Sequence, residues 1–158
     1  LELLRGDIET RLEAGVEATA YLEDAHRRPR PCLDQGRLLS RELVTTAMDV
    51  SDGLVGDLSK LCASSGVAAR VYAEAVPVHP LLKKAFPRKS LELALDGGED
   101  YQLLFTASEM VMARVLPQIG PPAAVIGEIV DGGVGSVMVV ESSGSQVQWR
   151  EGGWDHFK

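Results

Sequence analysis

AMDVSDGL, residues 47–54, joins an apolar, strand-like run to a helical pattern. Aspartate forms strands poorly and is seldom buried without a partner, so Asp49 and Asp52 are informative at this junction. With Ser51 between them they bring hard oxygen ligands together at a turn, and such a cluster suits Mg²⁺ and, through Mg²⁺, a polyphosphate. Helix capping is the competing interpretation, in which Ser51 or Asp52 is the N-cap residue and Asp49 has no special role. The local sequence leaves both interpretations open.

The patterns on both sides of this junction alternate between strand and helix. Residues 42–50 predict a strand, residues 53–65 predict a helix that ends at Gly66, and residues 67–73 predict a second strand. Further strands are expected at 101–106, 125–130, 134–140 and 147–149, and helices at 81–86, 90–95 and 108–116, the last closed by Pro117. Early alternation followed by a strand-rich end predicts an α+β fold with a mixed β-sheet packed against helices.

The turn Asp-Gly-Gly at 131–133 is typical of a hairpin, so we expect the strands on its two sides to pair directly. At the other end of the chain, apolar positions at helical spacing predict one amphipathic helix over residues 7–26. The basic, proline-rich residues 27–31 end that helix. They are interpreted as a solvated linker, with phosphate binding as the alternative. We therefore divide the chain into an N-terminal helix and Pro/Arg-rich linker, residues 1–41, and an α/β domain, residues 42–158.

Composition places the chain among ordinary globular proteins. It has 158 residues, of which 45% are apolar and 25% charged, and its net charge of −7 argues against non-specific binding to nucleic acid. Cys32 and Cys62 have neither a disulfide framework nor CxxC spacing, so we expect reduced thiols and a cytoplasmic location. No apolar run approaches the length of a membrane span. The chain opens with Leu1 in helix-like sequence, and we expect it to be a piece of a longer protein.

A second acidic cluster, DGGED at 96–100, precedes the strand expected at 101–106. Its two glycines permit close backbone approach to a ligand, and Glu99 and Asp100 then lie at the mouth of the strand. A plain solvent-exposed turn is the alternative interpretation. The C-terminal aromatic residues, Trp154 among them, either dock into the core or offer a flat wall for a ring-bearing substrate.

Three separated motifs together resemble thiamine-monophosphate kinases, of the aminoimidazole ribonucleotide synthetase-like superfamily. They are MDVSDGL followed by DL at 57–58, GGEDY followed by LLFT between 97 and 106, and WDHF at 154–157. Their order and spacing are similar to the C-terminal half of that family. Three positions depart from the family pattern, because Cys32 replaces a common Arg, Gln102 a frequent Glu, and Asp96 a small residue.

The resemblance implies transfer of the γ-phosphoryl group of ATP to thiamine phosphate, giving thiamine diphosphate, with Mg²⁺ as cofactor. Positioning and charge neutralisation dominate such reactions, which fits two oxygen-rich turns. The residues that the resemblance assigns are the Mg²⁺ ligands Asp49 and Asp52, the ATP contact Ser51, the thiamine phosphate contacts Glu99 and Trp154, and the further candidates Asp57 and Asp100.

The resemblance also implies an N-terminal half, with further carboxylates and the dimer interface of the family, that this chain lacks. We therefore expect no kinase activity from the chain alone, a homodimer for the full-length protein, and no nucleic-acid or membrane partner. Two alternatives remain open at this point. One is an ATP-dependent synthetase of the same superfamily, of the aminoimidazole ribonucleotide or selenophosphate type, and the other is a non-catalytic interaction domain.

Overall fold

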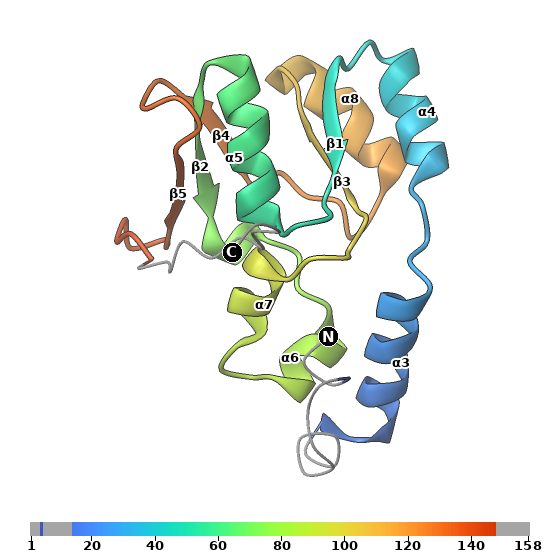
Figure 1. Cartoon of the computed structure of the whole chain (residues 1–158). Helices are drawn as coiled ribbons and strands as arrows, with labels where there is room; N and C mark the ends of the chain where they lie inside the picture. The colour runs from blue at the N-terminus through green and yellow to red at the C-terminus, as the bar shows by residue number, and fades with distance from the viewer. Residues whose placement is uncertain (1–3, 5–13, 148–158) are drawn as a thin grey trace.

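Two small β-sheets pack against helices in the computed structural model, which describes residue 4 and residues 14–147 (Figure 1). β1 (Thr46–Asp49) and β3 (Leu103–Thr106) form an antiparallel pair. β2 (Ala68–Tyr72) is the central strand of the second sheet, antiparallel to β4 (Gly127–Val130) and parallel to β5 (Val137–Val140). The predicted mixed α+β architecture is confirmed.

Helix α5 (Leu54–Ser65) lies between the two sheets and contacts β1, β2 and β5 (Figure 1). The remaining helices are α3 (Val16–Arg27), α4 (Leu33–Arg41), the 3₁₀ helix η1 (Ala73–Ala75), α6 (Pro80–Ala85), α7 (Ser90–Asp96) and α8 (Glu109–Ile119). α3 packs on α6, α4 on α8, and α7 on α5. Of the helices in the described residues, none combines the length and the apolarity needed to cross a bilayer.

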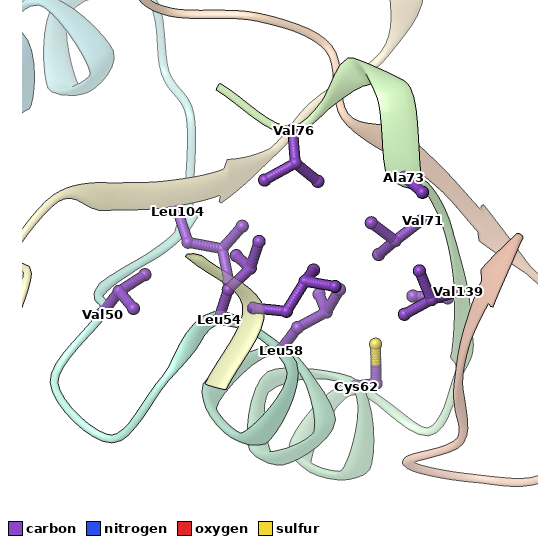
Figure 2. Close-up of a cluster of buried hydrophobic side chains, with 11 residues drawn as sticks. Val50, Leu54, Leu58, Cys62, Val71, Ala73, Val76, Leu104 and Val139 are labelled. Atoms are coloured by element: carbon purple, nitrogen blue, oxygen red, sulfur yellow. The ribbon is translucent and has the colours of Figure 1, made fainter. Parts of the chain in front are cut away.

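The core gathers around one face of α5, as Figure 2 shows. Leu54, Leu58 and Cys62 recur at a spacing of four residues and are all buried, which places them on one helix face. They meet Val71 of β2 and Leu104 of β3 in one apolar cluster. Burial of each such Leu or Val side chain stabilises the fold by about 1.5 to 3 kcal/mol relative to exposure. The same packing fixes the start of α5, and with it the turn that precedes the helix.

The two ends of α5 are set by glycines. Gly66 adopts a left-handed conformation (φ 70°) at the C-cap, as the sequence predicts. At the other end the N-cap residue is Gly53, with φ 106° and no side-chain cap. The capping interpretation of Ser51 or Asp52 is therefore wrong, and these residues lie in the turn ahead of the helix.

The hairpin expected at residues 131–133 is wrong, because β2 lies between β4 and β5. β2 has the most buried residues of the three strands, Ala68, Ala69 and Val71, and it gains pairing on both edges in this arrangement. The connection crosses the end of β2 and is held there by Gly135, whose N–H donates to Val67 and whose carbonyl accepts from the Ser59 hydroxyl at 2.7 Å.

Several predicted boundaries are also corrected. Residues 33–41, which the division at residue 41 groups with the linker, form helix α4, and only residues 28–32 separate α4 from α3. The two strands around the acidic turns are shorter than predicted, because Leu43 (φ 59°) and Tyr101 (φ 51°) have left-handed backbones that cannot continue a strand. Pro117 lies inside α8 and does not end it. The strand expected at 147–149 lies almost wholly outside the described residues. The single helix expected over 7–26 is corrected, because Gly15 (φ 82°) interrupts it after the helical Ala14 and α3 begins at Val16; residues 7–13 lie outside the described residues. The division of the chain at residue 41 remains a prediction.

Candidate functional site

The two acidic clusters come together at one end of the two-stranded sheet. β1 ends at Asp49, which pairs with Leu103 at the start of β3, so the turn after β1 and the turn before β3 are neighbours. We call these segments, residues 50–53 and 96–102, the paired turns. Three backbone hydrogen bonds join them: Val50 N–H to Gln102 at 2.9 Å, Tyr101 N–H to Val50 at 2.8 Å, and Glu99 N–H to Ser51 at 2.8 Å.

Glycines permit this close approach. A Cβ at Gly98 would lie 2.6 Å from the carbonyl oxygen of Ser51, and a Cβ at Gly53 would lie 2.9 Å from the carbonyl oxygen of Asp96. Side chains at either position would push the paired turns apart. Gly98 and Gly53 therefore serve backbone-to-backbone packing between the paired turns.

Asp57 anchors the first of the paired turns from inside the protein. Its side chain is 1% exposed, and Oδ2 accepts hydrogen bonds from the backbone N–H groups of Ser51 at 2.8 Å and Asp52 at 2.9 Å. Burial alone would raise the pKa of Asp57, but the hydrogen bonds from Lys60 and from these two N–H groups outweigh it and lower the pKa. Asp57 thus fixes the backbone of Ser51 and Asp52 from the buried side of the turn.

Lys60 connects Asp57 to Asp52. Its ammonium group lies 2.9 Å from Asp57 Oδ1 and 2.5 Å from Asp52 Oδ2. The two carboxylates raise the pKa of Lys60 through these hydrogen bonds, so the lysine is fully charged at neutral pH. The sequence reasoning missed Lys60. The signal that was available is its position three residues after Asp57, on the same helix face.

Negative charge collects around the hydroxyl of Tyr101. This hydroxyl donates to Glu99 Oε2 at 2.9 Å, and the pKa of Tyr101 is raised first by that hydrogen bond and the charge of Glu99, and further by the charges of Asp49 and Asp52. Asp49 and Glu99 are exposed and Asp52 is half-buried. The fold therefore brings three of the predicted site residues to one place.

The backbone at Glu99 (φ 73°) and Tyr101 (φ 51°) is left-handed, which costs a non-glycine residue about 1 kcal/mol or more. The strain is held by the hydrogen bonds of the paired turns. In this backbone conformation the Glu99 carboxylate accepts the hydrogen bond from the Tyr101 hydroxyl, two residues away. Sequence reasoning named Tyr101 within a motif but gave it no role.

Other predicted site residues have different surroundings. Ser51 is half-buried and uses both its backbone N–H and its carbonyl within the paired turns. Asp100 keeps an exposed surface, yet loss of water around its carboxylate raises its pKa to about 6. Trp154 lies outside the described residues.

In the described part of the chain, no three His, Cys, Asp or Glu side chains are arranged to hold a metal ion. Asp49 and Asp52 nonetheless offer the donor type that Mg²⁺ prefers, and Mg²⁺ is often held by one or two carboxylates while it keeps several waters. Asp57 fits less well, because one of its oxygens is taken by two N–H groups and the other by Lys60. The residues present therefore fit part of a magnesium site.

A groove of about 580 Å³ runs beside the paired turns. It is lined by Pro31, Cys32, Leu33, Gly36, Arg37, Ser40, Asp49, Tyr101 and Leu103. Cys32 lies 3.5 Å from Gln102 Oε1, so two of the positions that depart from the family pattern contact each other. Of the basic cluster next to the groove, Arg28 pairs with Asp24 of α3 at 3.3 Å, which favours the solvated interpretation.

The fold and the paired turns define an α+β domain with carboxylates gathered at one end of its two-stranded sheet. The chain belongs to the family described as AIR synthase related protein, C-terminal domain, whose model matches residues 7–140.

Relatives and solved structures agree with this family. Thiamine-monophosphate kinase of Salmonella typhimurium is 34% identical over 155 residues, which cover 95% of this chain and 47% of the relative. The Bacillus subtilis enzyme of that name is 30% identical, with 95% and 46% covered. The structure of AaThiL complexed with AMPPCP and TMP superposes with a TM-score of 0.73 at 32% identity, covering 90% of this chain and 43% of AaThiL. The chain thus spans about half the length of the relatives that it matches.

Proposed function

We propose that this chain is the C-terminal domain of a thiamine-monophosphate kinase, which transfers the γ-phosphoryl group of ATP to thiamine phosphate. The observation that carries the proposal is that strand pairing and the backbone hydrogen bonds of the paired turns bring Asp49, Asp52 and Glu99 to one end of the two-stranded sheet. The similarity to kinases along nearly the whole chain supports the choice of reaction. The fold alone would not support one reaction over another, because one fold hosts many activities.

In the proposed reaction a phosphate oxygen of thiamine phosphate forms a bond to the γ-phosphorus, the bond from that phosphorus to the β–γ bridging oxygen breaks, and ADP leaves. Bound Mg²⁺ would neutralise charge on the phosphates. Asp49 and Asp52 would hold the ion, and Ser51 would contact ATP. Asp57 would keep the turn that carries Ser51 and Asp52 in one conformation, through its two N–H hydrogen bonds. The residues of this chain thus position and neutralise charge, which is what phosphoryl transfer requires.

Glu99 and Trp154 would bind thiamine phosphate. The thiazolium ring of thiamine is cationic, so it is attracted to the carboxylate of Glu99, which lies exposed at the paired turns. An aromatic face such as that of Trp154 attracts both a ring and a positive charge. The hydrogen bond from the Tyr101 hydroxyl orients Glu99 for this contact.

Fluorescence of the chain tests the substrate. Trp149 and Trp154 are its two tryptophans, so Trp149→Phe leaves Trp154 as the reporter. Thiamine phosphate should quench this signal, Glu99→Gln should weaken the binding at least tenfold, and Glu109→Gln, an exposed acid on α8, should not. Quenching by aminoimidazole ribonucleotide in place of thiamine phosphate would favour a synthetase of the same superfamily. Equal binding by Glu99→Gln and Glu109→Gln would refute the role of Glu99.

An activity assay tests whether this chain alone can catalyse the proposed reaction. Because the chain spans about half of its relatives, we expect no thiamine diphosphate from it with ATP, Mg²⁺ and thiamine phosphate. An ATP-dependent thiamine diphosphate signal that disappears in Asp49→Ala would show that the chain is sufficient. In the full-length protein, which we propose to be a cytoplasmic homodimer, the same substitution should abolish turnover.

A further inference from the structure

Lys60 brings a positive charge to the carboxylates of the paired turns. Its ammonium group bridges Asp52 Oδ2 at 2.5 Å and Asp57 Oδ1 at 2.9 Å. The side chain is 57% exposed, although its partner Asp57 is 1% exposed. The two ion pairs thus hold the charge of a flexible lysine beside the first of the paired turns.

The two carboxylates that Lys60 bridges are not equivalent. Asp57 is buried and also accepts two backbone N–H groups, so it cannot leave its place without leaving those groups unpaired. Asp52 is 27% exposed and belongs to the turn at the surface. Lys60 can therefore release Asp52 while it stays bound to Asp57.

We propose that Lys60 is a built-in cation that neutralises Asp52 while no divalent cation is bound, and that it gives up Asp52 when Mg²⁺ binds. The proposal rests on the proposed function, in which Asp52 is a ligand of Mg²⁺. Lys60 then competes with the ion for one carboxylate and repels it through the remaining charge. Two charges of +1 and +2 a few ångströms apart, partly screened by water and salt, weaken binding by about three- to tenfold.

The competition has a second consequence, for stability. Without Lys60, Asp52 and the buried Asp57 would lose the cation that bridges them, which destabilises the metal-free protein. A divalent ion would then replace the missing charge. Lys60 therefore makes the fold of the paired turns independent of the metal, at the expense of metal affinity.

The test compares metal binding by Lys60→Met with wild type. Calorimetric titration with Mg²⁺ should give an affinity about three- to tenfold higher for Lys60→Met. Lys60→Arg, which keeps the charge, and Lys83→Met, which removes an exposed lysine on α6, should stay near wild type. The increase of Tm on addition of Mg²⁺ should also be larger for Lys60→Met. An unchanged affinity for Lys60→Met would overturn the proposal.

Two further measurements keep the outcomes separate. In the wild-type chain, the NMR signals of the Lys60 side chain should shift as Mg²⁺ is added, with the same midpoint as the calorimetric titration, and no shift at saturation would overturn the proposal even if Lys60→Met did not fold. Asp52→Asn should weaken Mg²⁺ binding. If it does not, the metal role of Asp52 in the proposed function fails. If Asp52→Asn weakens binding and Lys60→Met does not strengthen it, the role of Lys60 alone fails.

Discussion

The backbone N–H of Glu99 donates a hydrogen bond of 2.8 Å to the carbonyl oxygen of Ser51, and so joins the two acidic turns directly. With the bond from Tyr101 to Val50, it continues the ladder of β1 and β3 beyond the strands. The site is therefore positioned by backbone and by Asp57, whereas Asp49 and Glu99 extend from it into solvent. Substitutions at Asp49 and Glu99 should change chemistry with little effect on the fold.

Gly98→Ala should separate the paired turns. The new Cβ would lie 2.6 Å from the carbonyl oxygen of Ser51, a backbone atom that cannot yield without loss of its hydrogen bond to Glu99. Urea unfolding should show a loss of about 1 to 3 kcal/mol. Gly36→Ala in α4 is the control, because its Cβ would make an ordinary contact of 3.8 Å with Leu103 and should stabilise the helix by up to about 1 kcal/mol. Equal stabilities of Gly98→Ala and wild type would contradict the close packing.

Asp57→Asn should lower stability and flatten its dependence on acid. The hydrogen bonds to Asp57 hold its folded pKa below the unfolded value of about 3.9, so its contribution is fully present above that pH and is lost as pH falls through the folded pKa. Loss of the charged acceptor should cost about 2 kcal/mol at pH 7.

Urea unfolding of Asp57→Asn between pH 7 and pH 2 measures this effect, with Asp131→Asn, an exposed acid in the other sheet's loop, as the control. The wild type and the control should lose stability below about pH 4 more steeply than Asp57→Asn. Parallel curves for all three proteins would mean that Asp57 carries no such linkage.

The elements predicted best from the sequence are those set by local chemistry. The helix from Leu54 to Ser65 and its end at Gly66 follow from apolar spacing and a left-handed glycine. The acidic motifs were placed correctly beside strands, because turn residues there interrupt apolar runs. Local pattern failed where pairing between distant segments decides the topology. β2 pairs with β4 on one edge and with β5 on the other, so the two strands of the expected hairpin are separated.

Two features of the site were beyond a reading of the sequence. The bridge of Lys60 to Asp52 spans eight residues and depends on how the turn meets α5, which no periodicity shows. The left-handed backbones of Glu99 and Tyr101 are imposed by the hydrogen bonds of the paired turns, against the preference of both residue types. Outside the site, helix α4 was not predicted, because the prolines before it and Gly36 within it both disfavour helix.

The ionisation of Tyr101 should report on charge at the site. Its pKa is raised by the hydrogen bond to Glu99 and by the carboxylates of Glu99, Asp49 and Asp52. Glu99→Gln should therefore lower the pKa of Tyr101, and so should a divalent cation bound at Asp49 and Asp52, because both remove negative charge. The ring-carbon NMR signal of Tyr101 measures this during an alkaline titration. An identical titration curve in Glu99→Gln would show that the two side chains do not interact in solution.

The two cysteines should differ sharply in reactivity. Cys62 is 1% exposed in the core of Figure 2, and burial raises the pKa of its thiol, so few thiolates form and none is accessible. Cys32 is half-buried and lines the groove beside Asp49. A thiol reagent at neutral pH should therefore modify one cysteine per native chain quickly and the second only as the protein unfolds. Cys32→Ser should remove the fast phase and Cys62→Ala the slow one. If both cysteines reacted at one rate in the native chain, α5 would not be packed as the structure has it.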